Sequence, residues 1–160
     1  RDDEFGICSR NLELKPTDNN ALWRTSARYD LKGAIEDMGG DLALQGELIG
    51  PGIQGNKYKL ADTQFRVFNI YDIGKGRYLD FAESQRRLDG RVWGVPLVED
   101  RLVLDESVDG LVEMAKGKSA LADIHREGIV IRRLVETLDP ELGRLSFKVI
   151  NPDFLLKWVE

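Results

Sequence analysis

Two stretches decide the fold of this chain: REGIVIR at residues 126–132 and SFKVIN at residues 146–151. Each is a short run rich in β-branched and aromatic residues, which is typical of a β-strand. The first run carries a carboxylate near its start, Glu127, and the second carries a lysine in its middle, Lys148. If both strands present these side chains to one cleft, the acid can hold a metal ion and the base can hold a phosphate group.

The apolar pattern predicts further elements along the rest of the chain. Alternation predicts a strand or hairpin arm, apolar runs predict strands, and apolar residues three to four positions apart predict helices. A strand or hairpin arm is expected at 5–15, and strands are expected at 41–50, 64–73, 128–134 and 145–150. The expected helices are 21–38, 81–88 and 107–122, and 92–104 is extended. Strands outnumber helices and mostly follow one another without long crossovers. We therefore expect an α+β domain with antiparallel sheets and flanking helices.

Length and charge limit the classes of protein that the chain can belong to. Its 160 residues are enough for one domain with a sizeable core and hardly enough for two. No run approaches the roughly 20 apolar residues that a membrane-spanning helix needs. The formal net charge of −5 argues against a general nucleic-acid coat, because phosphate binding depends on Lys and Arg. It still allows a local basic track.

The chain has one cysteine, Cys8, and one histidine, His125. A single cysteine excludes an internal disulfide, and the pair cannot make a structural zinc site. Cys8 lies in an apolar run, so we expect it to be buried. The thiol pattern and the missing signal peptide favour a cytoplasmic location, and nothing indicates a membrane or a protein partner.

Taken in order, several motifs resemble those of the covalent nucleotidyltransferases, the superfamily of polynucleotide ligases and capping enzymes. The likeness is greatest to ATP-dependent RNA ligases of the nick-sealing phage type and their bacterial relatives. The stretch LQGELIGPGIQ at residues 44–54 is the strongest match, and FGICSRN at 5–11 and FRVFNIY at 65–71 also match. This resemblance covers nearly the whole chain and implies a nucleotidyltransferase (ATP-grasp-like ligase) domain.

The resemblance implies a role for each matching residue. Glu47 would accept hydrogen bonds from the ribose of ATP, Phe68 would stack on the purine, and Arg10 would contact phosphate. Glu127 would serve Mg²⁺, and Lys148 would bind the α-phosphate. Each residue also has a structural alternative when taken alone: an exposed arginine, a core aromatic ring, or a surface acid or lysine on a strand.

Two departures from the family pattern stand out. The family often has a second lysine two residues after the first, but Ile150 occupies that position here, and Lys157 is a candidate substitute. The nucleophile motif Lys-x-(Asp/His/Asn)-Gly is missing, since no lysine precedes Lys15. We expect that residues 1–160 are a single adenylyltransferase domain that lacks its N-terminal part, because the chain starts in the middle of the pattern.

Basic residues gather around the predicted helix at 81–88 and form a candidate track for the RNA backbone. They are Lys75, Arg77, Arg86, Arg87 and Arg91. The alternative is a solvated helix face, because Glu83 and Asp89 lie among them. Together with Arg10, these residues are the expected contacts for RNA ends, in a nicked duplex by analogy with the family.

The implied reaction joins a 5′-phosphate and a 3′-hydroxyl of RNA through an enzyme-adenylate and an RNA-adenylate. The complete protein would be an ATP-dependent RNA ligase, although this chain alone would not form the enzyme-adenylate. One alternative is a non-catalytic relative that binds nucleotide or RNA ends. Another is a nucleotidyltransferase of the DNA ligase type or the GTP-dependent capping type.

Overall fold

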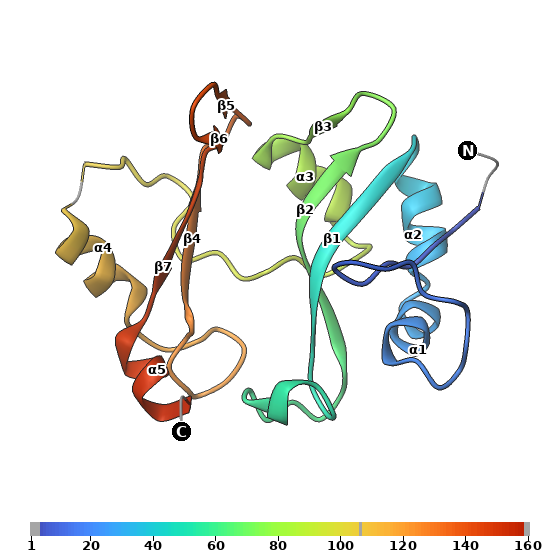
Figure 1. Ribbon diagram of the computed structural model, residues 1–160, viewed down its shortest axis with the longest axis horizontal. Helices are drawn as coiled ribbons and strands as arrows, with labels where there is room; N and C mark the ends of the chain where they lie inside the picture. Colours follow the sequence, from blue (N-terminus) through green and yellow to red (C-terminus); the bar gives the residue numbers. More distant parts are fainter. Residues whose placement is uncertain (1–3, 106, 159–160) are drawn as a thin grey trace.

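The computed structural model describes residues 4–105 and 107–158. It contains a sheet with the strand order β1-β2-β3, a second sheet made of β4 and β7, and a small pair made of β5 and β6. All strand pairs within these sheets are antiparallel. The predicted α+β class with antiparallel sheets and flanking helices is therefore confirmed (Figure 1).

The elements follow one another in this order: α1 (Ala21–Arg28), α2 (Leu31–Met38), β1 (Leu42–Ile49), the 3-10 helix η1 (Gln54–Asn56), β2 (Gln64–Asp72), β3 (Arg77–Tyr78), α3 (Phe81–Leu88), α4 (Val108–Ala115), β4 (Gly128–Arg132), β5 (Leu138–Asp139), β6 (Gly143–Arg144), β7 (Ser146–Ile150) and α5 (Pro152–Trp158). Within the described ranges, no helix has the length and apolar character that crossing a membrane requires.

The first sheet holds the main hydrophobic core. Apolar side chains of β1 and β2 meet those of α2, α3 and the segment after β3, and together they exclude water. The buried cluster consists of Met38, Leu42, Val67, Ile70, Leu79 and Leu88. The chain after α3 continues along the outer edge of β2, where Val67 N–H donates to Trp93 O at 2.9 Å and Val95 N–H donates to Val67 O at 2.9 Å.

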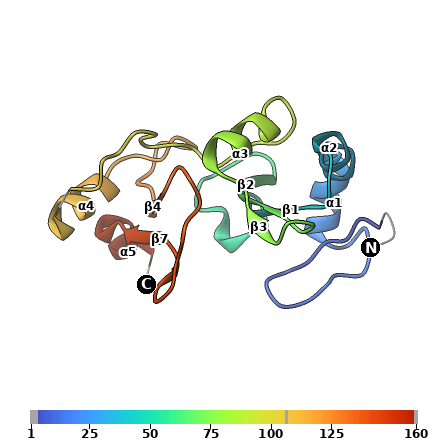
Figure 2. The same ribbon diagram turned by 90° about the horizontal axis from the view of Figure 1, so that it is seen from above.

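The second sheet lies beside the first and carries α4 and α5 (Figures 1 and 2). Three apolar residues are buried on this side of the molecule: Ala115 of α4, Ile129 of β4 and Phe154 of α5. Asn151 is fully buried between β7 and α5. Its side-chain amide donates to Arg126 O at 2.9 Å, and its side-chain oxygen accepts from Asp153 N–H at 3.0 Å. Asn151 thereby links the start of β4 to the first turn of α5.

The predicted single helix at 21–38 is wrong, because the chain forms α1 and α2 with a break between them. Asp30 adopts the left-handed conformation with φ 44°, and a right-handed α-helix cannot continue through a residue in this conformation. Its carboxylate accepts a hydrogen bond from Gly33 N–H at 3.2 Å and so caps α2. Apolar spacing is unchanged across such a break, so the periodicity alone did not reveal it.

Two further expectations need correction, and one pair of alternatives is decided. The helix predicted at 107–122 ends at Ala115, because Arg126 binds the last carbonyls of α4 and Gly117 has φ 121°. Of the two alternatives for 5–15, a strand or a hairpin arm, the hairpin is confirmed, because an isolated antiparallel bridge joins Cys8 and Glu13. Cys8 is exposed, not buried, because this hairpin lies on the surface. In contrast, the strands predicted at 41–50, 64–73, 128–134 and 145–150 and the helix at 81–88 are confirmed.

Candidate active site

Glu127 and Lys148 form an ion pair on the second sheet. Lys148 is in the middle of β7 opposite Val130, and Glu127 immediately precedes β4. The Lys148 Nζ atom lies 2.6 Å from Glu127 Oε1. The two side chains are 54% and 44% exposed, so both remain accessible to a ligand.

The glycine after Glu127 brings the two strands close together at this point. A Cβ atom at Gly128 would lie 2.2 Å from the carbonyl oxygen of Val149, which is well inside van der Waals contact. Glu127 O also accepts from Asn151 N–H at 2.8 Å, which extends the ladder beyond β4. The carboxylate and the lysine therefore project from a part of the sheet where the backbone is held on both strands.

Glu47, Phe68, Glu127 and Lys148 all line one cavity of about 700 Å³. The first two residues belong to β1 and β2, whereas Lys148 belongs to β7 and Glu127 immediately precedes β4. The cavity thus lies between the two sheets, with predicted site residues on both walls. A volume of this size is typical of sites that bind a small molecule or a cofactor.

Glu47 is half-buried, and its charge is influenced from both walls. Burial raises the pKa of its carboxyl group, and the negative charge of Glu127 raises it further, whereas Lys148 and Lys57 oppose the shift. The pKa of the Tyr58 phenol is raised by burial and by the negative charges of Glu127 and Glu47. The acids, the lysine and the tyrosine therefore form one electrostatic cluster across the cavity.

Phe68 occupies a β-bulge. Asn69 pairs with Gln45 and Val67 pairs with Gly46, so Phe68 is the extra residue between two ladder positions. A bulge re-aims side chains and is common next to active sites. The Phe68 side chain lines the cavity, and the residue is 39% exposed, which is unusual for a phenylalanine in a sheet.

The cavity residues that sequence reasoning missed include Tyr58, Val130 and Arg132. Tyr58 lies in the loop between β1 and β2, and no periodic pattern covers such a segment. Val130 is 51% exposed and faces the same side of the sheet as its partner Lys148. Paired residues on neighbouring strands point to the same face, so Lys148 would have placed Val130 on the cavity side. Alternation along β4 then places Arg132, two residues later, on that side as well.

The residues predicted to bind RNA are not among those that line the cavity. Arg10 is exposed in the N-terminal hairpin, and Arg86 is exposed on α3. The other four take part in contacts within the chain, and Arg91 donates to the carbonyl oxygens of Arg87 and Asp89 at 3.5 and 3.2 Å. Lys75 pairs with Asp72 at 2.9 Å, while Arg77 and Arg87 pair with Glu83 at 3.6 and 3.2 Å. Their role toward RNA stays a prediction.

A divalent cation in this cavity would rely on few protein ligands. In residues 4–105 and 107–158 there is no group of three or more His, Cys, Asp or Glu side chains that could hold a metal. Glu127 offers a hard carboxylate oxygen and is partly exposed. This suits Mg²⁺, which is usually bound through one or two carboxylates together with phosphate oxygens and water.

Comparisons with known sequences and structures give the following matches. Residues 1–150 match the family model described as RNA ligase. Among solved structures, the chain is similar to the RNA ligase of Naegleria gruberi in several forms. A lysine-to-alanine mutant with ATP and Mn is 37% identical with a TM-score of 0.88, over 99% of this chain and 46% of that chain. The ligase with PPi is 38% identical with a TM-score of 0.86, over 98% and 46%.

A third form of the same ligase, a lysine-to-methionine mutant with AMP and Mn, is 38% identical with a TM-score of 0.86, over 98% of this chain and 46% of that chain. The chain therefore spans a little under half the length of these solved chains. A search of curated proteins found none that matches.

Proposed function

The chain belongs to the RNA ligase family, and from this premise we propose that it is the adenylyltransferase domain of an ATP-dependent RNA ligase. The proposal rests most directly on one observation. The ion pair between Glu127 and Lys148 shares a cavity with Glu47 and Phe68, which come from the opposite sheet. This places an apolar ring, two carboxylates and a cationic amine around a space that can hold one nucleotide.

Each chemical part of ATP has a matching group in this cavity. The partly exposed ring of Phe68 offers a surface for the purine, and Glu47 offers acceptors for the ribose hydroxyls. Lys148 would neutralise the α-phosphate, and Glu127 would hold Mg²⁺. A bound divalent cation would neutralise negative charge on the phosphates. The solved relatives with ATP, AMP and Mn support this choice of ligands.

The protein residues act on phosphoryl transfer by placement and charge. Displacement at phosphorus requires the nucleophile and the leaving group to be in line, and the enzyme contributes positioning and charge neutralisation. Lys148 would leave Glu127 when phosphate enters, because its ammonium group can then pair with phosphate oxygens instead. Phe68 and Glu47 would prevent rotation of the nucleoside, which keeps the α-phosphate beside Lys148.

The covalent step requires a lysine that this sequence does not contain. No lysine in the chain is followed by the pattern x-(Asp/His/Asn)-Gly. The function proposed for residues 1–160 is therefore nucleotide and metal binding, and joining of RNA ends is proposed for the complete protein only. With Ile150 in place of the second motif lysine, Lys148 would carry the α-phosphate alone or with Lys157.

RNA ends with a 5′-phosphate and a 3′-hydroxyl are the proposed substrates, in a nicked duplex. The family and its solved relative support RNA as the substrate class. Arg10 and Arg86 are exposed basic residues on the proposed RNA surface. A cytoplasmic location is part of the same proposal.

Nucleotide binding by the chain itself tests the proposal. Calorimetric titration with ATP and Mg²⁺ should detect binding, and Lys148→Met should weaken it about 10- to 100-fold, because a charge-assisted hydrogen bond contributes about 1.5–3 kcal/mol. Lys32→Met is the matched control, since Lys32 is 57% exposed and pairs with Glu36 on a helix surface. Equal ATP affinity of wild type and Lys148→Met would contradict the assignment.

Further titrations and sealing assays distinguish the proposed function from the alternative functions. A non-catalytic nucleotide-binding relative would bind ATP, yet the complete protein would never become labelled by α-labelled ATP. Preference for GTP or NAD over ATP would indicate a capping-type or NAD-dependent enzyme. Sealing of DNA nicks in preference to RNA nicks would replace RNA ligase by DNA ligase.

A further inference from the structure

The bulge at Phe68 leaves this residue without a paired residue on β1. In a regular ladder each residue has a paired residue on the adjacent strand. Here the consecutive β1 residues Gln45 and Gly46 pair with Asn69 and Val67 of β2, and Phe68 is skipped. Phe68 is an exposed residue, and its carbonyl can accept a hydrogen bond from a donor outside the ladder. The donor here comes from the other side of the cavity.

Arg132, the last residue of β4, supplies this donor. Its Nη1 atom donates to Phe68 O at 2.6 Å and to the side-chain oxygen of Asn69 at 2.7 Å. Its guanidinium carbon lies 5.8 Å from the centre of the Phe68 ring, which is within the range of a cation–π contact. One side chain therefore contacts both the backbone and the ring of Phe68.

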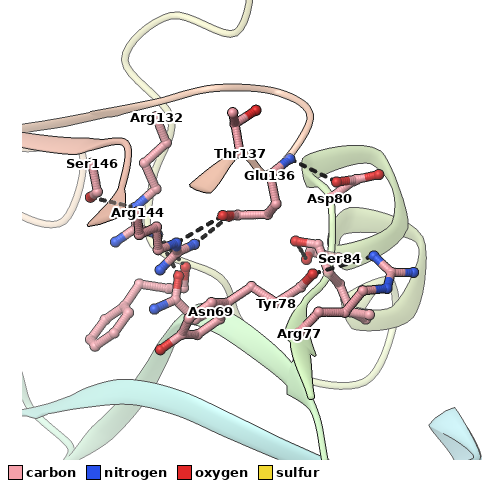
Figure 3. A network of polar contacts seen from close by, with 12 residues as sticks. Asn69, Arg77, Tyr78, Asp80, Ser84, Arg132, Glu136, Thr137, Arg144 and Ser146 are labelled. Carbon is pink, nitrogen blue, oxygen red and sulfur yellow. Dashed lines mark hydrogen bonds and ion pairs between the residues drawn. The ribbon is translucent and has the colours of Figure 1, made fainter. Parts of the chain in front are cut away.

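Arg132 is itself held on both sides. Its Nε atom donates to Ser146 Oγ at 3.2 Å on the neighbouring strand β7. On the first sheet, Asn69 is held in turn, because its amide donates to the side-chain oxygen of Gln45 at 2.9 Å. Figure 3 shows Arg132 extending from the second sheet toward Asn69, with Ser146 beside it. The contacts form one continuous path across both sheets.

Given the proposed stacking of Phe68 on the purine, we infer that Arg132 is a positioning residue that holds Phe68 in the conformation that receives the base. The inference deepens the proposed function and rests on it. A stacking surface is useful only when its orientation is kept without a large loss of entropy on binding. Arg132 provides this because it pairs with the bulge carbonyl before any ligand arrives.

A direct role of Arg132 toward phosphate predicts a different pattern of binding. A residue that acts through the ring should affect ligands that carry a base and leave ligands without a base unchanged. ATP and inorganic tripolyphosphate are such a pair, because they share the triphosphate and differ in the nucleoside. The variants are Arg132→Met, which keeps the length of the side chain, and Arg132→Lys, which keeps its charge but loses the planar fork.

Arg144→Met is the matched control. Arg144 belongs to the same region, where it pairs with Glu136 and lies 3.9 Å from the centre of the Tyr78 ring (Figure 3). No contact of Arg144 involves Phe68 among those of the described residues. A general loosening of the two sheets would affect both arginine variants, whereas loss of the Phe68 contact affects only the Arg132 variants.

Binding of both ligands in the presence of Mg²⁺ is measured by calorimetry on the 160-residue chain. We expect Arg132→Met to raise the Kd for ATP about tenfold, within the range of one base–aromatic stack, and to leave the Kd for tripolyphosphate unchanged. The effect of Arg132→Met should largely disappear in a Phe68→Ala background, because the contact it acts through is then gone. Arg144→Met should bind both ligands as the wild type does.

Equal weakening for ATP and tripolyphosphate, or full additivity with Phe68→Ala, would overturn the inference. Unchanged ATP affinity in both Arg132→Met and Arg132→Lys would do the same. If the wild type binds no ATP, the proposed function fails, and backbone ¹⁵N relaxation then decides about Arg132 separately. Increased mobility of Phe68 and Asn69 in Arg132→Met but not in Arg144→Met supports positioning, and equal mobility in all three proteins rejects it.

Discussion

Glu47 shows at the scale of a single residue how a binding site conflicts with stability. Its carboxyl group lies in a half-buried position near a second carboxylate, and both features disfavour the charged form. Such a group is useful for binding ribose hydroxyls and unfavourable for folding. Function and stability therefore place opposite demands on the same side chain.

Glu47→Gln should raise the melting temperature at neutral pH. The pKa of Glu47 is raised in the folded protein, so its stabilising contribution is complete below the unfolded pKa and is lost as the pH rises through the folded pKa. The glutamine has no such loss, so the difference between variant and wild type should shrink as the medium becomes acidic. Thermal unfolding at several pH values measures this.

Glu36→Gln is the control, because Glu36 is exposed on α2. It should show a much smaller change with pH than Glu47→Gln. A melting temperature of Glu47→Gln below that of the wild type at neutral pH would mean that the carboxylate has a stabilising partner which outweighs its burial.

Gly128→Ala should destabilise the protein by about 1–3 kcal/mol, the usual cost of overpacking. The added Cβ would lie 2.2 Å from Val149 O and 3.0 Å from Ile150 Cα, so β7 would have to move. Urea denaturation measures the change. Gly6→Ala is the control, since the nearest atom there is the flexible end of Glu13 at 3.5 Å. Equal stabilities of the two variants would show that β7 yields without cost.

At the scale of elements, short helices depend on side chains that bind their ends. Helices α1, α2, α3 and α4 have eight residues each, so capping groups satisfy a large share of their backbone. The carboxyl end of α4 is bound by Arg126, whose guanidinium donates to the carbonyls of Met114, Ala115 and Lys116 at 2.8, 3.1 and 2.6 Å. A cation is favourable there because it meets the negative end of the helix dipole.

Arg126→Met should therefore cost about 1–3 kcal/mol of unfolding free energy, since three carbonyls lose a charged donor. Hydrogen exchange should become faster in α4 than in α3, because only α4 loses its end contact. Arg86→Met, at an exposed arginine of α3, should change stability little. A loss of stability in Arg126→Met that is no larger than in Arg86→Met would show that water replaces the arginine without cost.

At the scale of the whole molecule, the two sheets are joined at one end by a polar network. The guanidinium of Arg144 on β6 pairs with Glu136 and stacks on Tyr78 of β3. Glu136 N–H donates to the side chain of Asp80 at 2.8 Å, and Phe81 N–H donates to Leu134 O at 2.9 Å. Figure 3 shows the contacts of Glu136 with Arg144 and with Asp80.

A double-mutant cycle of Arg144→Met and Glu136→Gln should give a coupling free energy of about 1–3 kcal/mol, because the pair is mostly buried. The side chains are only 19% and 20% exposed. The pair of Lys118 and Asp123, which is 69% and 84% exposed, should give a coupling of about 0–1 kcal/mol in the same measurement. Equal couplings would mean that the network contributes nothing to joining the two sheets.

Local patterns in the sequence were sufficient to predict the strands that carry the candidate site. β4 and β7 are short runs of β-branched and aromatic residues, and the acid and lysine in them were predicted to meet. The break between α1 and α2 was not predictable from apolar spacing, because one left-handed residue, Asp30, interrupts the helix without disturbing the period. β3 and the β5–β6 pair are two residues per strand, which is too short for any period to appear.

The sequence by itself determined the α+β class, the RNA ligase resemblance and the identity of Glu47, Phe68, Glu127 and Lys148 as the candidate site, because strand alternation and short motifs are local properties. Only the tertiary structure decided that these four line one cavity and that Phe68 lies in a bulge held by Arg132. The physical reason is that register between strands and contact between sheets depend on residues far apart in the chain, and no local period encodes them.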